Sequence, residues 1–353
     1  MSVNVAILGF AHGHVAKYIE KWEEEADLAV NIKAGWDHDA DRLEKFAGKH
    51  GFTAYRDIHE LLDSESVGAV VIAAETSMHA DLVESAADAG KKIVLQKPMA
   101  LTMQEADRIV DAVRRNDVGF TVAWQMRVDE QNIRIKELID KGVIGRVFMV
   151  RRRHGLSVCL KPAFADSWHM DPEANRDIWA DDSAHPIDFV NWLFGKPKSV
   201  TAEIVSLHDE RMPMDNGVAI FRYPGGPLVE VACSFTNHAC ENTTEVIGEK
   251  GSIVQNYGDV PSCNVPRPEN SVGLKWYLAE TGEWSDSRLS TPRGHGERIA
   301  ALAYPLAAFM RGDGAPLTAP EEARTSLRMT LACYVSAEEG RRVAIDDPAV
   351  EKV

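Results

Sequence analysis

The sequence has no long apolar segment and no closely spaced cysteine pair. Its longest apolar stretches, Val67–Ala74 and Ile299–Met310, fall short of the roughly 18 residues that a membrane-spanning helix needs. No basic leader or apolar signal core stands at the N-terminus. The five cysteines form no CxxC motif, which favours free thiols in a reducing cytoplasm over disulfides or a zinc site. They are Cys159, Cys233, Cys240, Cys263 and Cys333.

Basic residues are also scarce, since 39 Lys and Arg stand against 54 Asp and Glu, for a net charge of −15. This acidity argues against nucleic acid or an anionic membrane surface as the main partner. The 45% hydrophobic and 26% charged residues are ordinary for a globular protein with a sizeable core. A length of 353 residues predicts two domains, with three as the alternative, and we find no internal repeat or low-complexity linker.

Residues 1–123 alternate between predicted strands and predicted helices, which indicates parallel βαβ units in a doubly wound sheet. The apolar segment Ala69–Ala74 is typical of a strand buried on both faces. Thr102 and Glu105 form a capping box at the start of one helix. The predicted strands are Val3–Leu8, Ile32–Trp36, Ala69–Ala74, Ile93–Leu95 and Phe120–Ala123, and the helices are Val15–Glu25, Ala40–Lys49, Ala80–Ala89 and Thr102–Arg115.

Residues 124–353 follow another pattern, which predicts an α+β domain with a large, mostly antiparallel sheet. Between the first strand and the later ones lies the irregular segment Ala163–Asp181, rich in Trp, His, Asp and Pro. The predicted strands are Val147–Arg153, Ser199–Ser206, Val218–Tyr223, Leu228–Phe235, Thr243–Ile247, Ser252–Gln255 and Leu274–Leu278. The predicted helices are Asn132–Lys141, Asp182–Phe194, Gly296–Met310 and Ala319–Gly340.

A glycine-containing loop, Gly9-Phe10-Ala11-His12-Gly13-His14, connects the first strand to the first helix. In the dinucleotide fingerprint GxGxxG, the glycines allow a tight turn and a close approach to the pyrophosphate, which the helix N-terminus also attracts. Only Gly9 matches strictly, because Ala11 and His14 occupy the other two positions. The strand–loop–helix context supports a cofactor loop, and an ordinary βα turn is the alternative.

Asp37 stands at the end of the second predicted strand. An acidic side chain there accepts hydrogen bonds from the adenosine ribose and repels a 2′-phosphate, which favours NAD over NADP. Arg42, five residues later, would soften that preference, so NADP stays possible. The alternative is that Asp37 only caps the following helix, since Asp39 and Asp41 crowd the same turn.

Two further clusters carry possible chemistry. Gln96-Lys97-Pro98 follows the fourth strand of the doubly wound sheet, at the edge where ligands bind in such folds. Asp181-x-x-x-His185-x-x-Asp188 would place a carboxylate near an imidazole, which suits a general base. Because Pro186 is tolerated only in a first turn, we expect the helix to start near Asp182. A solvated lysine and a capping aspartate with a packed histidine are the alternatives.

In this order the clusters resemble the Gfo/Idh/MocA oxidoreductase family over nearly the whole chain. The resemblance rests on the Gly9 loop, Asp37, Ala89–Ala100, Gly142–Gly145 and the Asp181–Gly195 segment. It implies an N-terminal Rossmann domain, residues 1–123, that binds NAD(P). It also implies a C-terminal substrate-binding domain, residues 124–353, whose open sheet pairs copies into a homodimer or homotetramer.

The resemblance also implies roles for individual residues. Lys97 would orient the reacting hydroxyl, His185 would take its proton, and Asp181 would hold the substrate or the imidazole. The segment after the third strand would line the cofactor cleft, with Ala74, Thr76, Ser77 and His79. The residues implied to bind the cofactor are Gly9, Phe10, Ala11, His12, Gly13, His14, Asp37, Arg42, Ala74, Thr76, His79, Gln96, Lys97 and Pro98.

The sequence departs from the family pattern at three places. Gln96 replaces a glutamate, and the loss of that charge should favour a lower pKa of Lys97. Bulky side chains in Asn175–Ala180 replace a glycine-rich stretch and should reshape the substrate pocket. His12 and His14 are unusual in a phosphate loop, where they either touch phosphate or pack beneath it.

The leading hypothesis is an NAD(P)-dependent dehydrogenase that acts on a secondary alcohol of a sugar, polyol or cyclitol. One alternative is a glycoside hydrolase that oxidises its substrate transiently on bound NAD, and another is a non-catalytic dinucleotide or sugar sensor. We expect substrate contacts from Arg127, Trp168, His169 and Arg176. We expect no metal, because His12-x-His14 and His169-x-Asp171 lack a third ligand at a recognisable spacing.

Overall fold

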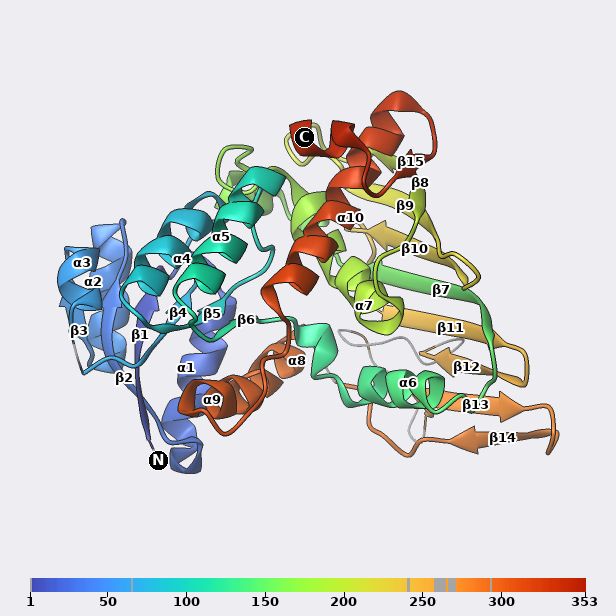
Figure 1. Ribbon diagram of the computed structural model, residues 1–353, viewed down its shortest axis with the longest axis horizontal. Helices are drawn as coiled ribbons and strands as arrows, with labels where there is room; N and C mark the ends of the chain where they lie inside the picture. The colour runs from blue at the N-terminus through green and yellow to red at the C-terminus, as the bar shows by residue number, and fades with distance from the viewer. Residues whose placement is uncertain (1, 65, 240–241, 257–264, 266–270, 293) are drawn as a thin grey trace. The chain divides into compact units, whose positions relative to one another are not determined.

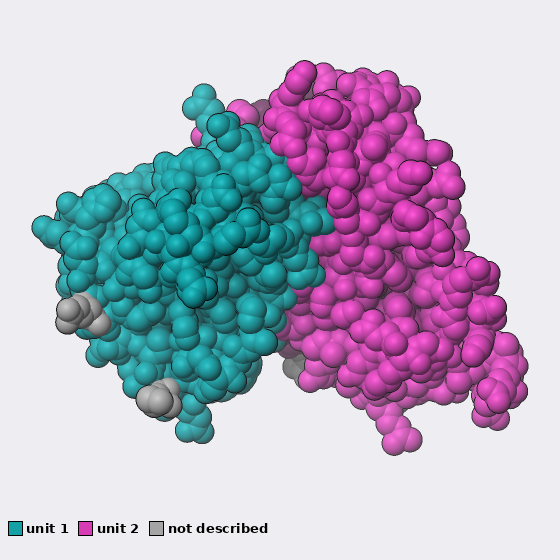
Figure 2. All heavy atoms as spheres, viewed as in Figure 1, with its two compact units in different colours: residues 1–125, 173–175, 299–327 teal, residues 126–172, 176–298, 328–353 magenta. Residues whose placement is uncertain are grey.

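The computed structural model describes residues 2–64, 66–239, 242–256, 265, 271–292 and 294–353, so Cys240 and Cys263 lie outside the described residues. The chain forms two compact units (Figure 2). Unit 1 comprises residues 1–125, 173–175 and 299–327, and unit 2 comprises residues 126–172, 176–298 and 328–353. Each unit is therefore assembled from segments that are distant in the sequence.

The centre of unit 1 is a six-stranded parallel sheet in the order β3-β2-β1-β4-β5-β6 (Figure 1). This order confirms the predicted doubly wound sheet, with β1 and β4 as neighbours at its middle. All four residues of β4 are buried, in agreement with their continuous apolar sequence. The strands are β1 (Val3–Leu8), β2 (Val30–Trp36), β3 (Thr53–Tyr55), β4 (Ala69–Ile72), β5 (Lys92–Leu95) and β6 (Phe120–Val122).

Two groups of helices cover this sheet. Helices α4 and α5 contact each other and lie over β4 and β5, whereas α1 and α9 pack together against β2 and β1 (Figure 1). The capping box of Thr102 and Glu105 is present at the start of α5. The helices of unit 1 are α1 (His14–Glu24), α2 (Ala40–His50), α3 (Ile58–Leu62), α4 (His79–Asp88), α5 (Met103–Arg115) and α9 (Ala303–Arg311).

Unit 2 is built on a nine-stranded mixed sheet in the order β14-β13-β12-β11-β7-β10-β9-β8-β15 (Figure 1). Among the described strands of this sheet, only the pairing of β7 with β10 is parallel, so the sheet is mostly antiparallel, as predicted. The strands are β7 (Val147–Gly155), β8 (Ser199–Val205), β9 (Asn216–Arg222), β10 (Leu228–Ser234), β11 (Asn242–Gly248), β12 (Gly251–Gln255), β13 (Leu274–Leu278), β14 (Glu283–Asp286) and β15 (Val343–Ala344).

The two faces of this sheet differ. In β9 the buried residues Ala219 and Phe221 alternate with the exposed residues Val218 and Ile220, which is the period expected for a sheet covered on one face. Helix α7 (Ala184–Phe194) contacts β7 and β10 on the covered face. Helix α6 (Glu130–Asp140) also belongs to unit 2, whereas α8 (His295–Ala301) and α10 (Pro320–Glu339) carry residues of both units.

Two predicted helices differ from the observed ones. The segment predicted as one helix over Gly296–Met310 is two helices, α8 and α9. Pro305 explains the break, because it lacks an N–H and its ring would clash with the carbonyl of Ala301 in a continuous helix. The helix predicted from Asp182 is preceded by a π-helical turn over Trp179–Ser183 that runs directly into α7.

No helix in the described part of the chain is both long and apolar enough to cross a membrane.

Candidate functional site

The loop after β1 has the geometry of a dinucleotide cradle. Gly9 has φ = +86°, and a Cβ atom there would approach the Cα of Ala74 to 2.4 Å, so only glycine fits. Its N–H donates to the carbonyl of Trp36 at 2.7 Å, and the N–H of His12 donates to that of Ala73 at 2.9 Å. The loop is thereby held against the carboxyl ends of β2 and β4, where ligands bind in open parallel sheets.

Helix α1 begins directly after this loop. Its N-cap is Gly13, and a Cβ atom there would meet no heavy atom within 4 Å among the described residues. The first turn carries no acidic side chain, so the positive end of the helix dipole suits an anion. The rings of His12 and His14 meet edge to face at 4.4 Å. The ring of Phe10 is buried against Phe46, so Phe10 can contact a cofactor only through its backbone atoms.

Asp37 lies at the end of β2, where the sequence predicted the ribose-binding acid. Its buried carboxylate accepts hydrogen bonds from the backbone N–H groups of Phe10 and Asp39, both at 2.8 Å. It is not the cap of α2, because that position belongs to Asp39. Arg42 binds Asp37 with two hydrogen bonds of 2.7 Å and also contacts Glu75 at 3.0 Å. Burial lowers the pKa of Arg42, but Asp37 and Glu75 outweigh it and raise that pKa overall.

The loop after β4 is covered by residues that sequence reasoning did not assign to this unit. Thr76 donates a hydrogen bond from its hydroxyl to Asn175 at 2.6 Å, and the N–H of Ser77 donates to the carbonyl of Ala174 at 3.0 Å. The residues that contact this loop are in the short segment Glu173–Asn175, which belongs to unit 1. The irregular segment Ala163–Asp181 has no local sequence pattern that predicts this contact with unit 1.

His79 links α4 to the loop that carries Lys97. Its Nδ1 lies 3.0 Å from the carbonyl oxygen of Pro98, and since that oxygen only accepts, Nδ1 carries the proton. Burial lowers the pKa of His79 to about 4, although the nearby carbonyls oppose this shift. A neutral His79 therefore donates its Nδ1 proton to the carbonyl of Pro98.

Lys97 is buried directly after β5, and its peptide bond to Pro98 is cis. A lysine is almost never fully buried without a structural or functional reason. The preceding Gln96 is also buried, and its amide nitrogen donates to the hydroxyl of Tyr18 at 2.8 Å. The side chain of Gln96 is therefore bonded to a neutral hydroxyl group from α1.

In unit 2, the π-helical turn and the first turn of α7 place three ionisable side chains in the interior, namely Asp181, Asp182 and His185. Asp181 lies 2.9 Å from Nδ1 of His169, and Asp182 lies 3.7 Å from Nε2 of His185. Asp182 is therefore a further carboxylate close to His185, next to the predicted Asp181 in the chain. Wider turns of this kind occur often at functional sites.

The four expected substrate residues fall into different environments. Arg127 forms a buried, two-bond ion pair with Asp188, with distances of 2.7 and 2.8 Å. The ring of His169 stacks on that of Trp168 at 4.0 Å, and His169 also contacts Asp181. The ring of Trp168 is therefore close to Asp181. Arg176 has φ = +73° and lies over the ring of Tyr334 at 5.5 Å. Trp168 and His169 therefore lie near Asp181, whereas Arg127 is held by Asp188.

Sequence reasoning missed two histidines near His185. The ring of His154 lies 6.1 Å from that of His185, and the ring of His295 lies 6.5 Å from it. His154 is at the end of β7, and the alternation of that strand was the available signal, because it places His154 on the same covered face as Arg152.

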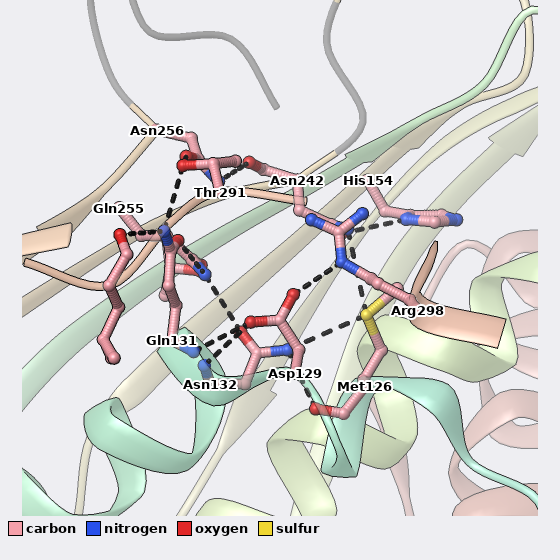
Figure 3. Close-up of polar contacts among 12 residues, drawn as sticks. Met126, Asp129, Gln131, Asn132, His154, Asn242, Gln255, Asn256, Thr291 and Arg298 are labelled. Carbon is pink, nitrogen blue, oxygen red and sulfur yellow. Dashed lines mark hydrogen bonds and ion pairs between the residues drawn. The ribbon is translucent and has the colours of Figure 1, made fainter. Parts of the chain in front are cut away.

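Figure 3 shows that a buried polar network orients His154. Arg152 donates to Oδ1 of Asn242 at 3.0 Å, and the same oxygen lies 3.1 Å from Nδ1 of His154. Because a guanidinium only donates, the amide atom between them is an oxygen, and Nδ1 of His154 carries the proton. The other ring nitrogen of a neutral His154 is therefore an acceptor.

The same network fixes the start of α6. Asp129 caps the helix through the N–H of Gln131 at 2.9 Å, and forms a buried ion pair with Arg298 at 2.5 Å (Figure 3). Gln255 on β12 donates to Gln131 at 3.2 Å and to Asn132 at 3.1 Å. The covered face of the sheet is thereby tied to the helix by satisfied polar groups.

Within the described residues, no group of three or more His, Cys, Asp or Glu side chains is arranged to hold a metal ion.

Comparison with known proteins agrees with this geometry. A curated relative, myo-inositol 2-dehydrogenase of Thermotoga maritima, is 23% identical over 314 residues, which cover 87% of this chain and 89% of the relative. A solved oxidoreductase from Agrobacterium radiobacter, in complex with NAD+, L-tartaric acid and magnesium, has a TM-score of 0.81 at 21% identity and covers 98% of this chain and 99% of its own. Levoglucosan dehydrogenase in complex with NADH and levoglucosan has a TM-score of 0.80 at 21% identity, covering 98% and 100%. At these identities the two structures establish the fold.

Two family profiles match the chain in succession. The profile described as an oxidoreductase family with an NAD-binding Rossmann fold matches residues 3–124, and the GFO/IDH/MocA C-terminal domain matches residues 133–254. Together they cover about two-thirds of the chain. The chain belongs to the GFO/IDH/MocA family of NAD(P)-binding oxidoreductases.

Proposed function

We propose that this protein is an NAD(P)-dependent dehydrogenase that oxidises a secondary alcohol of a sugar, polyol or cyclitol. One observation carries the proposal: a buried lysine, Lys97, follows β5 at the same edge of the parallel sheet as the Gly9 loop and Asp37. Burial of an ammonium group costs free energy, so its position beside a dinucleotide cradle supports a chemical role.

The residues of unit 1 fit a dinucleotide. The Gly9 loop and the N-terminus of α1 would hold the pyrophosphate, and Asp37 would hold the adenosine ribose. When bound, the nicotinamide supplies the hydride chemistry that no side chain provides. Thr76, fixed by Asn175, would support the loop after β4.

The remaining roles concern the proton of the substrate hydroxyl. Lys97 would donate a hydrogen bond to that oxygen and favour loss of its proton. A ring nitrogen of His185 would take the proton, and the carboxylate of Asp182 would stabilise the resulting imidazolium. Asp181, paired with His169, would hold the substrate.

The names of the relatives support the substrate class. They include dehydrogenases of myo-inositol, levoglucosan and D-xylose, all of which are polyhydroxylated compounds. These names favour net oxidation over the glycosidase and sensor alternatives. A dehydrogenase accumulates NADH with a polyol, whereas the glycosidase alternative predicts a flat nicotinamide absorbance while an aryl glycoside releases its sugar.

The variant Lys97→Met tests the proposal. Loss of a group that acts on the reacting hydroxyl should lower turnover by about 10²-fold or more. The affinity for NADH, measured by quenching of tryptophan emission, should stay within about threefold. The matched control is Lys17→Met, which removes an exposed lysine on α1 and should leave turnover unchanged. Near-normal turnover of Lys97→Met would refute the assigned role.

We also propose that the open face of the large sheet pairs with a second copy of this chain. Val205, Val218 and Ile220 are each about 40% exposed on this face. Charges of both signs accompany them, since Arg151 lies between Glu230 and Glu245 at 3.7 and 3.8 Å. A face that carries charges of both signs and exposed apolar side chains, in a chain of net charge −15, suits association with itself.

We propose a cytoplasmic location on the basis of the thiols. Cys159, Cys233 and Cys333 are free and buried, and burial raises the pKa of the Cys159 thiol to about 12. Such thiols act as apolar core groups and suit a reducing compartment.

A further inference from the structure

The carboxylate of Asp37 is saturated with hydrogen bonds. Its Oδ2 accepts from the N–H of Phe10 at 2.8 Å and from Nε of Arg42 at 2.7 Å. Its Oδ1 accepts from the N–H of Asp39 at 2.8 Å and from Nη2 of Arg42 at 2.7 Å. A carboxylate offers about four acceptor positions, so these four donors use its full capacity.

An adenosine ribose needs two of the same positions. In dinucleotide folds the acid after the second strand accepts hydrogen bonds from the ribose hydroxyls. The two backbone donors to Asp37 belong to loops that position the site, whereas Arg42 donates from a side chain that is 21% exposed. Arg42 is therefore the donor that has to leave when the ribose binds.

In the same position, Arg42 also contacts two groups other than Asp37. Its Nη2 lies 3.0 Å from Oε1 of Glu75 and 3.1 Å from Nε2 of His38. The same Nε2 lies 3.0 Å from Oε2 of Glu75. One ring nitrogen of a neutral histidine cannot accept from Arg42 and donate to Glu75 at once. Nε2 of His38 therefore forms a hydrogen bond with either Arg42 or Glu75, but not with both.

We infer that Arg42 is a latch over the adenosine ribose position that sets the choice between NAD and NADP. Displaced from Asp37, its guanidinium stays near Glu75 and His38 and is available to a 2′-phosphate. A phosphate gains a two-bond partner there, which offsets its repulsion by Asp37. Glu75 competes with the phosphate for Arg42 and so limits the preference for NADP. This inference rests on the proposed function, because it needs unit 1 to bind a dinucleotide.

The test uses two fragments that lack nicotinamide, ADP-ribose and 2′-phospho-ADP-ribose. Their dissociation constants are measured by isothermal titration calorimetry on the full-length protein, freed of any bound dinucleotide. In Arg42→Met, ADP-ribose should bind about three- to tenfold more tightly, because no latch has to be displaced. The 2′-phosphorylated fragment should bind at least tenfold more weakly, because its cationic partner is lost.

Glu75→Gln provides the opposite change. This variant keeps the shape of the side chain but removes the carboxylate that competes for Arg42. The 2′-phosphorylated fragment should bind about fivefold or more tightly, and ADP-ribose should change by less than about threefold. The matched control is Arg56→Met, which breaks an exposed ion pair with Glu44 in the same unit and should change neither constant.

The outcomes separate this inference from the proposed function. Equal weakening of both fragments in Arg42→Met would mean that Arg42 only holds Asp37 in place, and would overturn the latch. Unchanged constants in both variants would overturn it as well. Failure of ADP-ribose to bind the unaltered protein would instead remove the dinucleotide site on which the proposed function depends.

Discussion

At the scale of single residues, the unit 1 site is shaped by how each buried polar group is neutralised. Arg42 neutralises Asp37, whereas Gln96 and His79 are uncharged and hydrogen-bonded in the interior. For His79, burial holds the pKa at about 4, well below the 6.5 of a free imidazole. The loop that carries Lys97 therefore depends on a neutral His79, and acid should weaken it.

The sign of this effect follows from linkage. Below pH 6.5 the unfolded chain takes up a proton on His79, and the folded chain does not until about pH 4. The stability that His79 contributes above pH 6.5 is therefore lost as the pH falls toward 4, by about 3 kcal/mol in full. His79→Asn keeps a donor for Pro98 without a titrating group, so its free energy of unfolding should fall less between pH 7 and 4.5.

Urea unfolding at the two pH values measures this difference. His59→Asn, at an exposed histidine of the same unit, is the control and should follow the unaltered protein. Parallel behaviour of His79→Asn and the unaltered protein would show that His79 is not the acid-sensitive group.

At this scale the sequence predicts where the site residues lie in the fold, but not which side chains they contact. The positions of Gly9, Asp37 and Lys97 at strand ends followed from strand and helix periodicity. The pairing of Arg42 with Asp37 did not, because an exposed turn of α2 allows several rotamers that no sequence pattern ranks. The pairing of Asp181 with His169 depends on the path of an irregular segment, for which no periodicity exists.

At the scale of elements, the π-helical turn before α7 depends on a glycine in β9. A Cβ atom on Gly217 would approach Cζ3 of Trp179 to 2.4 Å and the carbonyl oxygen of Glu203 to 2.8 Å. Trp179 is the buried first residue of the π-helical turn, so its ring position sets where Asp181 and Asp182 lie. Because Gly217 has no side chain, the ring of Trp179 has room to pack against β9, and this position of the ring determines where the π-helical turn lies.

Gly217→Ala should therefore affect both stability and turnover. Overpacking against Trp179 should lower the free energy of unfolding by about 1–3 kcal/mol. Movement of the turn should reduce kcat more than the affinity for NADH, since the cofactor loop belongs to unit 1. Gly48→Ala is the control, because its Cβ atom meets no described heavy atom within 4 Å and alanine favours helix α2. A stability and kcat equal to those of the control would contradict this account.

The elements themselves were mostly predictable. Each long periodic segment in residues 1–123 appears as a strand or helix within a few residues of its predicted bounds. The missed strands and α-helix are short, namely β3, α3, β14 and β15. The π-helical turn was missed for another reason, because its wider backbone bonding leaves no signature in a pattern read at 3.6 residues per turn.

At the scale of the whole molecule, chain order does not determine which unit a segment joins. Residues 299–327 lie in sequence between β14 and β15 of the nine-stranded sheet but belong to unit 1, where Trp22 donates to the carbonyl of Ala303 at 2.9 Å. A contact between residues 281 positions apart depends on tertiary packing, which periodicity does not encode. The open face of the nine-stranded sheet is a whole-molecule feature of the same kind, since its apolar side chains come from separate strands.

If a second copy covers this face, charge placed at its centre should separate the copies. Val218 and Ile220 are neighbours on β9, opposite Glu203 and Glu230 on the adjoining strands. The double variant Val218→Glu/Ile220→Glu adds like charges to the face in both copies, and their desolvation and repulsion should prevent pairing. Both positions are exposed, so the fold itself should tolerate the change.

Light scattering coupled to size-exclusion chromatography measures the outcome. The unaltered protein should elute at a multiple of the 39.0 kDa chain mass, and the double variant at the chain mass itself. Ile133→Glu is the control, because it places the same charge at an apolar residue of similar exposure on helix α6, and its assembly should persist. A monomeric unaltered protein would refute the pairing directly. An oligomer that survives in the double variant but dissociates in the control would move the interface from the sheet face to α6.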